Sequence, residues 1–155
     1  MLQAAGITHI VNCASECVNH HGARGITYAH LPLNDNVTEN IGTWILALET
    51  FPRSYAREQH ARPHLTGGIL FHCWQGRNRS VTMLATHLMT NQRFSDVFAT
   101  TLIRRGRGRA GPAHWFRDQL KHLHDWLQEQ PVGPLDWTKL PRLNRGGTRF
   151  ERTRG

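Results

Sequence analysis

The sequence predicts an α/β fold: one domain with a central, mostly parallel sheet flanked by helices. Three short runs rich in apolar and β-branched residues have the composition of buried strands, at residues 7–12, 26–31 and 69–72. Segments with helical spacing separate these runs, and an alternation of strands and helices favours a parallel sheet. The chain has 155 residues, of which 39% are hydrophobic, so it can bury one core without disulfide bonds.

Helices are predicted where apolar residues recur every three or four positions, which gives a helix one buried face. The first helix follows a cap at Thr38 or Asn40 and should end near Pro52, because proline disrupts a helix interior. Ser95 is expected to cap a short helix that runs through Leu102. The buried face of the first helix is Ile41, Trp44, Ile45 and Leu48. Two further helices have the faces Val81, Leu84, Ala85 and Leu88, and Phe116, Leu120, Leu123 and Leu127.

Two segments lack a regular pattern of apolar residues. Residues 53–68 contain arginines and histidines and are predicted to form an exposed basic loop. Residues 131–155 contain three prolines and five arginines, which predicts a basic tail that is extended or disordered. The folded domain is therefore expected to cover residues 1–130. Because the first predicted strand begins almost at once, we also expect that the start of the chain is trimmed.

Positive charge dominates the composition. The chain has 19 Lys and Arg against 11 Asp and Glu, which gives a formal net charge of +8 and a pI of about 10.7. Only Lys121 and Lys139 are lysines, so the other 17 basic residues are arginines. The planar guanidinium suits bidentate contacts to phosphate or carboxylate. We therefore expect an anionic, phosphorylated partner.

The sequence lacks the usual signals for membrane insertion and secretion. No stretch reaches the roughly 18–20 apolar residues of a membrane-spanning helix, and residues 1–14 lack the charged start and apolar run of a signal peptide. The three cysteines do not form a disulfide framework. We therefore expect a cytoplasmic protein, with the nucleus as an alternative location, and the sequence does not indicate the oligomeric state.

The most informative segment is residues 68–80, which combines a strand, a tight loop and the start of a helix. Such a loop turns successive backbone N–H groups and the positive end of a helix toward one point, where they can hold a phosphate. Cys73 opens the loop, and these dipoles favour its nucleophilic thiolate. Gly76 allows the loop to turn, and Arg79 can grip two oxygens of a bound group. The alternative is that Cys73 is an ordinary buried thiol at a strand end.

His72, Cys73, Arg79 and Ser80 form the pattern H-C-x5-R-S, and here the sequence resembles the dual-specificity phosphatase family of the cysteine-dependent protein tyrosine phosphatases. The resemblance extends over roughly residues 2–128. Its other parts are an early strand of the family at residues 2–14, the stretch that carries the general acid at residues 30–36, and an arginine-rich turn and final helix at residues 104–120.

This resemblance implies a protein phosphatase that uses no metal and no organic cofactor and hydrolyses phosphotyrosine and phosphoserine or phosphothreonine. It makes Cys73 the nucleophile that forms a phosphocysteine intermediate, Arg79 the ligand of the phosphoryl oxygens and Asp35 the general acid. Judged by its residue type alone, Asp35 is an ordinary turn residue. His72 would orient the loop, and Ser80 would hydrogen-bond the sulfur. The phosphate would lie against the backbone of Trp74, Gln75, Gly76, Arg77, Asn78 and Arg79.

The chain departs from the family pattern in two ways. Two strand segments that usually begin the family are missing, which leaves one edge of the sheet exposed. Trp74, Gln75, Arg77 and Asn78 stand where small residues and a serine are common. A G-R-x-R-S run also occurs in superfamily phosphatases that act on phospholipid head groups, and an asparagine before the arginine resembles RNA 5′-triphosphatases. Anionic lipid and RNA phosphates therefore stay open as substrates.

Two further clusters have competing interpretations. Cys13 and Cys17, followed by His20 and His21, could bind zinc, or Cys13 packs at a strand end while the others lie in a loop. The arginines of residues 104–109 could attract polyanionic substrates or contact the phosphates of RNA. A non-catalytic binder of RNA or phosphoproteins is therefore the alternative from another class of function.

Overall fold

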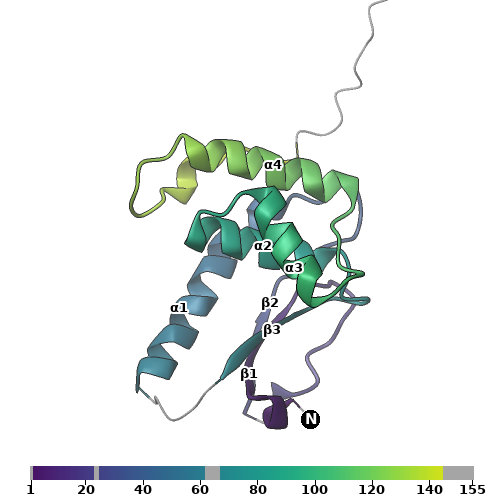
Figure 1. Ribbon diagram of the computed structural model, residues 1–155. Helices are drawn as coiled ribbons and strands as arrows, with labels where there is room; N and C mark the ends of the chain where they lie inside the picture. The colour runs from purple at the N-terminus through teal and green to yellow at the C-terminus, as the bar shows by residue number, and fades with distance from the viewer. Residues whose placement is uncertain (1, 23–24, 62–66, 145–155) are drawn as a thin grey trace, which may run out of the picture.

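The computed structural model describes residues 2–22, 25–61 and 67–144 of the chain (Figure 1). The strands are β1 (Ile7–Asn12), β2 (Thr27–His30) and β3 (Gly68–His72), and the α-helices are α1 (Ile45–Ala61), α2 (Arg79–Gln92), α3 (Asp96–Gly106) and α4 (His114–Gln128). Short 3-10 helices lie at η1 (Gln3–Ala5), η3 (Ile41–Trp44) and η4 (Trp137–Lys139). The order of the main elements is the predicted one, with strand ends within one residue of expectation.

The described strands form one parallel sheet in the order β2-β1-β3. At the centre, Val11 of β1 lies opposite Ala29 of β2 and Phe71 of β3. The predicted α/β fold with a parallel sheet is therefore confirmed. Because all three strands run the same way, their carboxyl ends meet at one edge of the sheet. The loops that follow them are brought together there.

The outer edge of β3 has no partner strand within the described chain. An apolar groove of about 570 Å³ borders this edge, between β3, α2 and α3. Its apolar lining comes from Leu70, Phe71, Val81, Leu84, Leu88, Leu102 and Ile103. The exposed sheet edge that the sequence predicts is thus found at β3 in the described residues.

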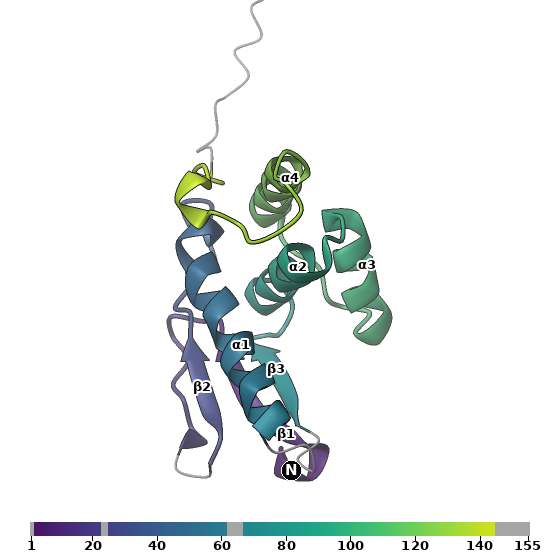
Figure 2. The ribbon, with the colours of Figure 1, turned by 90° about the vertical axis from the view of Figure 1, so that its left-hand side faces the viewer.

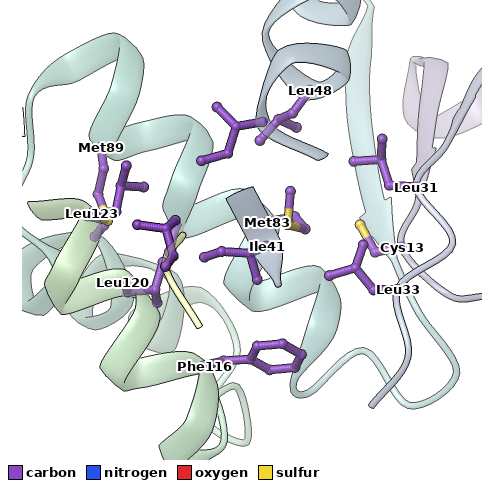
Figure 3. Close-up of a cluster of buried hydrophobic side chains, with 14 of the residues drawn as sticks. Cys13, Leu31, Leu33, Ile41, Leu48, Met83, Met89, Phe116, Leu120 and Leu123 are labelled. Atoms are coloured by element: carbon purple, nitrogen blue, oxygen red, sulfur yellow. The ribbon is translucent and has the colours of Figure 1, made fainter. Parts of the chain in front are cut away.

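The helices pack against the sheet and against one another. Figure 2 shows α2, α3 and α4 grouped together, with α1 alongside the strands. The core lies between these layers, and Leu33, Met83 and Phe116 point into it from three parts of the chain (Figure 3). Phe116 and Met83 are completely buried. Asn40 and Ser95 cap η3 and α3 with their side chains, as predicted.

Helix α1 continues through Pro52 to Ala61, so the predicted helix end near Pro52 is wrong. A proline inside a helix removes one backbone hydrogen bond and costs about 3 kcal/mol. Here aromatic packing opposes that cost: the rings of Phe51 and Tyr55 lie edge-on to His9 of β1, with centroids 5.4 and 4.9 Å away. The Tyr55 hydroxyl also donates to the Gly67 carbonyl. Residues 53–61 are therefore helical rather than part of a basic loop, and residues 62–66 of that prediction lie outside the described residues.

The segment from residue 131 to 144 folds back onto the domain, where the sequence predicts an extended tail. Leu143 is completely buried, and the ring of Trp137 packs 5.7 Å from that of Trp126. The Asn144 side-chain amide donates to the carbonyls of Val37 and Glu39, at 2.8 and 3.1 Å. Apolar residues among the prolines bury enough surface to fix this segment, so the prediction fails there. Residues 145–155 of the predicted tail lie outside the described residues.

Candidate active site

Three loops meet at the carboxyl edge of the sheet. The loop after β1 carries Glu16, the loop after β2 carries Asp35, and the loop after β3 runs from Cys73 to Arg79. We call the last two the Asp35 loop (residues 31–40) and the Cys73 loop (residues 73–79). Together they enclose a pocket of about 130 Å³ that is lined by Asp35, Cys73, Trp74, Gln75, Arg77, Asn78 and Arg79. The structure thus brings together residues that lie more than 40 positions apart in the sequence.

The Cys73 loop turns at Gly76, which has a φ of +64°. This left-handed conformation favours glycine, and a Cβ there would lie 3.2 Å from the Arg107 guanidinium. Arg107 donates to the carbonyl of Gln75 at 3.2 Å, and the Gly111 N–H donates to the carbonyl of Arg77 at 2.9 Å. Part of the arginine-rich segment therefore braces the loop from outside.

Cys73 is 8% exposed and lies at the base of the pocket. Burial alone would raise the pKa of its thiol, but hydrogen bonds from the Ser80 hydroxyl and from the backbone N–H groups of Ser80, Gly76 and Arg77 lower it below the usual range. The Cys73 Sγ lies 3.4 Å from the Ser80 Oγ. These donors stabilise the negative sulfur, so the thiolate is favoured.

Arg79 is buried at the start of α2 and is held by Glu16, a residue that the sequence analysis did not single out. Both terminal nitrogens of the guanidinium donate to the Glu16 carboxylate, one of them at 2.6 Å, and Nη1 also donates to the Leu33 carbonyl at 3.0 Å. This pair lowers the pKa of Glu16 to about 2 and raises that of Arg79. In the sequence, the only signal for this role of Glu16 is that it is an acidic residue soon after a strand end in a basic chain.

The Nε of Arg79 has no hydrogen-bond acceptor in the described part of the chain, although it is buried. It lies 3.7 Å from Oδ2 of Asp35, across the pocket. An unpaired buried N–H is costly, and an anion in the pocket would satisfy it. The pocket is thus lined by a free donor on Arg79, by the backbone N–H groups of the loop and by the Cys73 thiolate.

The remaining predicted residues occupy distinct places around the pocket. The ring of His72 is half-buried, which lowers its pKa, and it is hydrogen-bonded to the backbone of Cys73. Trp74 is 69% exposed, and Gln75 and Arg77 are also exposed, so their side chains lie at the pocket mouth. Asn78 of the Cys73 loop donates from its side chain to Asp35 of the Asp35 loop.

The cysteines of the zinc hypothesis do not form a metal site in the described segments. Cys13 is completely buried against the core, whereas Cys17 is partly exposed and His20 is exposed. No three His, Cys, Asp or Glu side chains are close enough to share a metal ion within residues 2–22, 25–61 and 67–144. The alternative placement, with Cys13 packed at the end of β1, is the one observed.

Comparisons with known proteins agree with this geometry. Residues 1–125 match the family model described as dual specificity phosphatase, catalytic domain, and the chain therefore belongs to this family. It is similar to dual specificity protein phosphatase 4 of Homo sapiens, with 31% identity over 144 residues that cover 87% of the chain. Protein-tyrosine-phosphatase MKP1 of Arabidopsis thaliana is 27% identical over 146 residues and covers 93% of the chain.

The chain spans only part of these relatives: 34% of the length of the human phosphatase and 18% of the plant one. Among solved structures, human DUSP28 superimposes with a TM-score of 0.68 and 26% identity, over 84% of this chain and 85% of that one.

Among the described helices, none is long and apolar enough to cross a membrane.

Proposed function

We propose that this domain is a phosphatase that hydrolyses phosphotyrosine and phosphoserine or phosphothreonine on proteins through a phosphocysteine intermediate. The observation that carries the proposal is that Cys73, Arg79 and Asp35 line one pocket. The pKa of the Cys73 thiol is lowered, and the Arg79 Nε lies near the Asp35 carboxyl group without a hydrogen-bond acceptor among the described residues. Membership of the dual specificity phosphatase family supports the same chemistry.

In the first step the Cys73 thiolate attacks phosphorus. An S–P bond forms while the bond from phosphorus to the leaving oxygen breaks, and Asp35 donates its proton to that oxygen. The loop amides and the Arg79 Nε hold the phosphoryl oxygens, whose charge is spread in the transition state. The free donor on Arg79 is satisfied when the phosphate is bound.

In the second step water attacks the phosphocysteine. Asp35 takes a proton from this water, an O–P bond forms, and the S–P bond breaks to return the thiolate and release inorganic phosphate. The Ser80 hydroxyl, 3.4 Å from the sulfur, stabilises the departing thiolate. His72 supports the loop through the backbone of Cys73.

The decisive test uses two variants of the chain. Cys73→Ser should abolish turnover of an aryl phosphate and preserve binding of inorganic phosphate, because the loop amides and Arg79 remain. Asp35→Asn should slow turnover about 10²-fold or more when the leaving oxygen is poor, and much less for an activated phenolate. Normal turnover by Cys73→Ser would overturn the mechanism.

Substrate class is tested by phosphate release from phosphopeptides, phosphoinositides and triphosphate-ended RNA. Fastest release from phosphopeptides supports the proposal, and selective release from lipid or RNA would replace it with the lipid or RNA alternative. Salt-dependent RNA binding without any turnover would instead identify a polyanion binder. We place the enzyme in the cytoplasm or nucleus, where phosphoproteins occur.

A further inference from the structure

The side chain of Asn78 joins two loops that are far apart in the sequence. Its Oδ1 accepts a hydrogen bond from the backbone N–H of Ala113 at 2.6 Å, and its Nδ2 donates to Oδ1 of Asp35. A backbone N–H can only donate, so the oxygen of the amide must face Ala113. The NH₂ group is therefore the end that faces Asp35, and the orientation of the amide follows from its partners.

This contact distinguishes the two oxygens of Asp35. Oδ1 accepts from Asn78, whereas Oδ2 lies 3.7 Å from the Arg79 Nε, which has no hydrogen-bond acceptor among the described residues. In a neutral carboxyl group the carbonyl oxygen is the better acceptor, and the other oxygen carries the proton. The donor on Asn78 thus directs the proton of Asp35 to Oδ2, beside the place where phosphoryl oxygens are bound.

The rest of Asn78 is anchored independently of this side chain. Its backbone carbonyl accepts from the N–H and the hydroxyl of Thr82, both at 2.9 Å. Although Asn78 precedes α2, its side chain makes no capping hydrogen bond to the helix. Shortening the side chain therefore leaves the start of α2 intact and removes the links to Asp35 and Ala113.

We propose that Asn78 is a positioning residue that holds Asp35 over the pocket with its proton on Oδ2. The inference rests on the proposed function, because it concerns the proton that Asp35 transfers. A serine, common within this part of the loop in the family, has one short hydroxyl and cannot span the distance to both Ala113 and Asp35. The longer side chain of Asn78 thus connects the Cys73 loop to the Asp35 loop and to the turn before α4, which a short polar residue at this position could not do.

The test compares Asn78→Ala and Asn78→Ser with the unchanged chain on two substrates. Turnover of a phosphotyrosine peptide, whose leaving oxygen needs the proton, should fall about tenfold, a fraction of what a complete general acid supplies. Turnover of an aryl phosphate with an acidic phenol should change less than about twofold, because that phenolate leaves without protonation. A residue that merely stabilised the loop would affect both substrates equally.

Asn91→Ala is the matched control, because it truncates an asparagine at the other end of α2, where the side chain contacts Glu49 and His87. It should keep the substrate ratio of the unchanged chain. In an Asp35→Asn background, Asn78→Ala should cause little further loss, since both variants remove the same proton transfer. Inhibition by orthovanadate should be equal in the unchanged chain and Asn78→Ala.

Equal losses on the two substrates, or fully multiplied losses in the double variant, would overturn the role of Asn78. These outcomes leave the proposed function standing if Cys73→Ser still abolishes turnover. Absence of turnover in the unchanged chain on every phosphate monoester would overturn both proposals together.

Discussion

The Cys73 loop and the Asp35 loop face each other across the same pocket but are held in different ways. The Cys73 loop is continuous in sequence between β3 and α2, and its own backbone N–H groups surround the sulfur. The Asp35 loop is held by side chains from remote segments. The Gln119 amide accepts from the Ile41 N–H at 2.9 Å and donates to the Glu39 carbonyl at 2.8 Å.

A segment near the end of the described chain contributes in the same way, since Asn144 donates to the carbonyls of Val37 and Glu39. The comparison teaches that the donors around the sulfur come from neighbouring residues of the sequence, while remote residues such as Arg107 and Glu16 brace the loop and hold Arg79. The acid half depends on the whole fold. Changes to the groups of the Cys73 loop that bind the phosphate should therefore affect every substrate. Changes around the Asp35 loop, and at the Asn78 side chain that contacts Asp35, should act through folding or through the proton.

After Cys73→Ser, the largest effect is expected for Arg79→Lys. The Arg79 guanidinium donates from two nitrogens to Glu16 and still has its Nε free for phosphate. Lysine keeps the positive charge but lacks this planar fork of donors. The value of kcat/KM should fall about 10²- to 10³-fold for activated and poor leaving groups alike. Arg117→Lys, at an exposed position on α4, is the control in the same phosphate-release assay. A loss confined to poor leaving groups would contradict the division between the two loops.

Leu143→Ala tests whether residues 131–144 belong to the folded unit. Because Leu143 is completely buried in the core, its truncation should lower the free energy of unfolding by about 2–5 kcal/mol. Chemical denaturation followed by fluorescence measures the change. Leu46→Ala removes the same side chain from an exposed position of α1 and should have a small effect. Equal stability of the two variants would show that the segment does not support the core.

The smallest effect is expected for Glu16→Gln, and it depends on pH. The pKa of Glu16 is lowered from 4.5 to about 2 by its hydrogen bond with Arg79. A lowered folded-state pKa contributes stability above the unfolded value, and that contribution is lost as the pH falls from about 4.5 toward 2. Because the Glu16 side chain is 45% exposed, solvent screening keeps the contribution modest.

Unfolding midpoints measured from neutral pH into acid should therefore fall less steeply in Glu16→Gln than in the unchanged chain. Glu129→Gln, a change at an exposed glutamate beyond α4, serves as the comparison and should keep the original slope. Identical slopes for all three proteins would contradict the assigned role of the Glu16–Arg79 pair.

The predictable parts of the fold are those where the signal is local. The β-branched run at Ile7–Asn12 became β1 with the predicted bounds, and Ser95 caps α3 as its residue type indicates. The prediction for Pro52 failed because a local penalty was opposed by aromatic contacts with His9, a partner more than 40 positions away. The prediction of an extended tail failed for residues 131–144 for a similar reason. Prolines and arginines are frequent in residues 131–155, but apolar residues among them pack on α4 and η3.

By itself the sequence determined the parallel α/β order and the Cys73 loop, because strand periodicity and the H-C-x5-R-S run are properties of neighbouring residues. Only the tertiary structure decided which remote residues come into contact. Glu16 bonds to Arg79, Asn78 bonds to Asp35, and residues 131–144 pack against the rest of the domain. The physical reason is that a hydrogen bond or an apolar contact acts over a few ångströms in space, and separation along the chain does not reveal which side chains come that close.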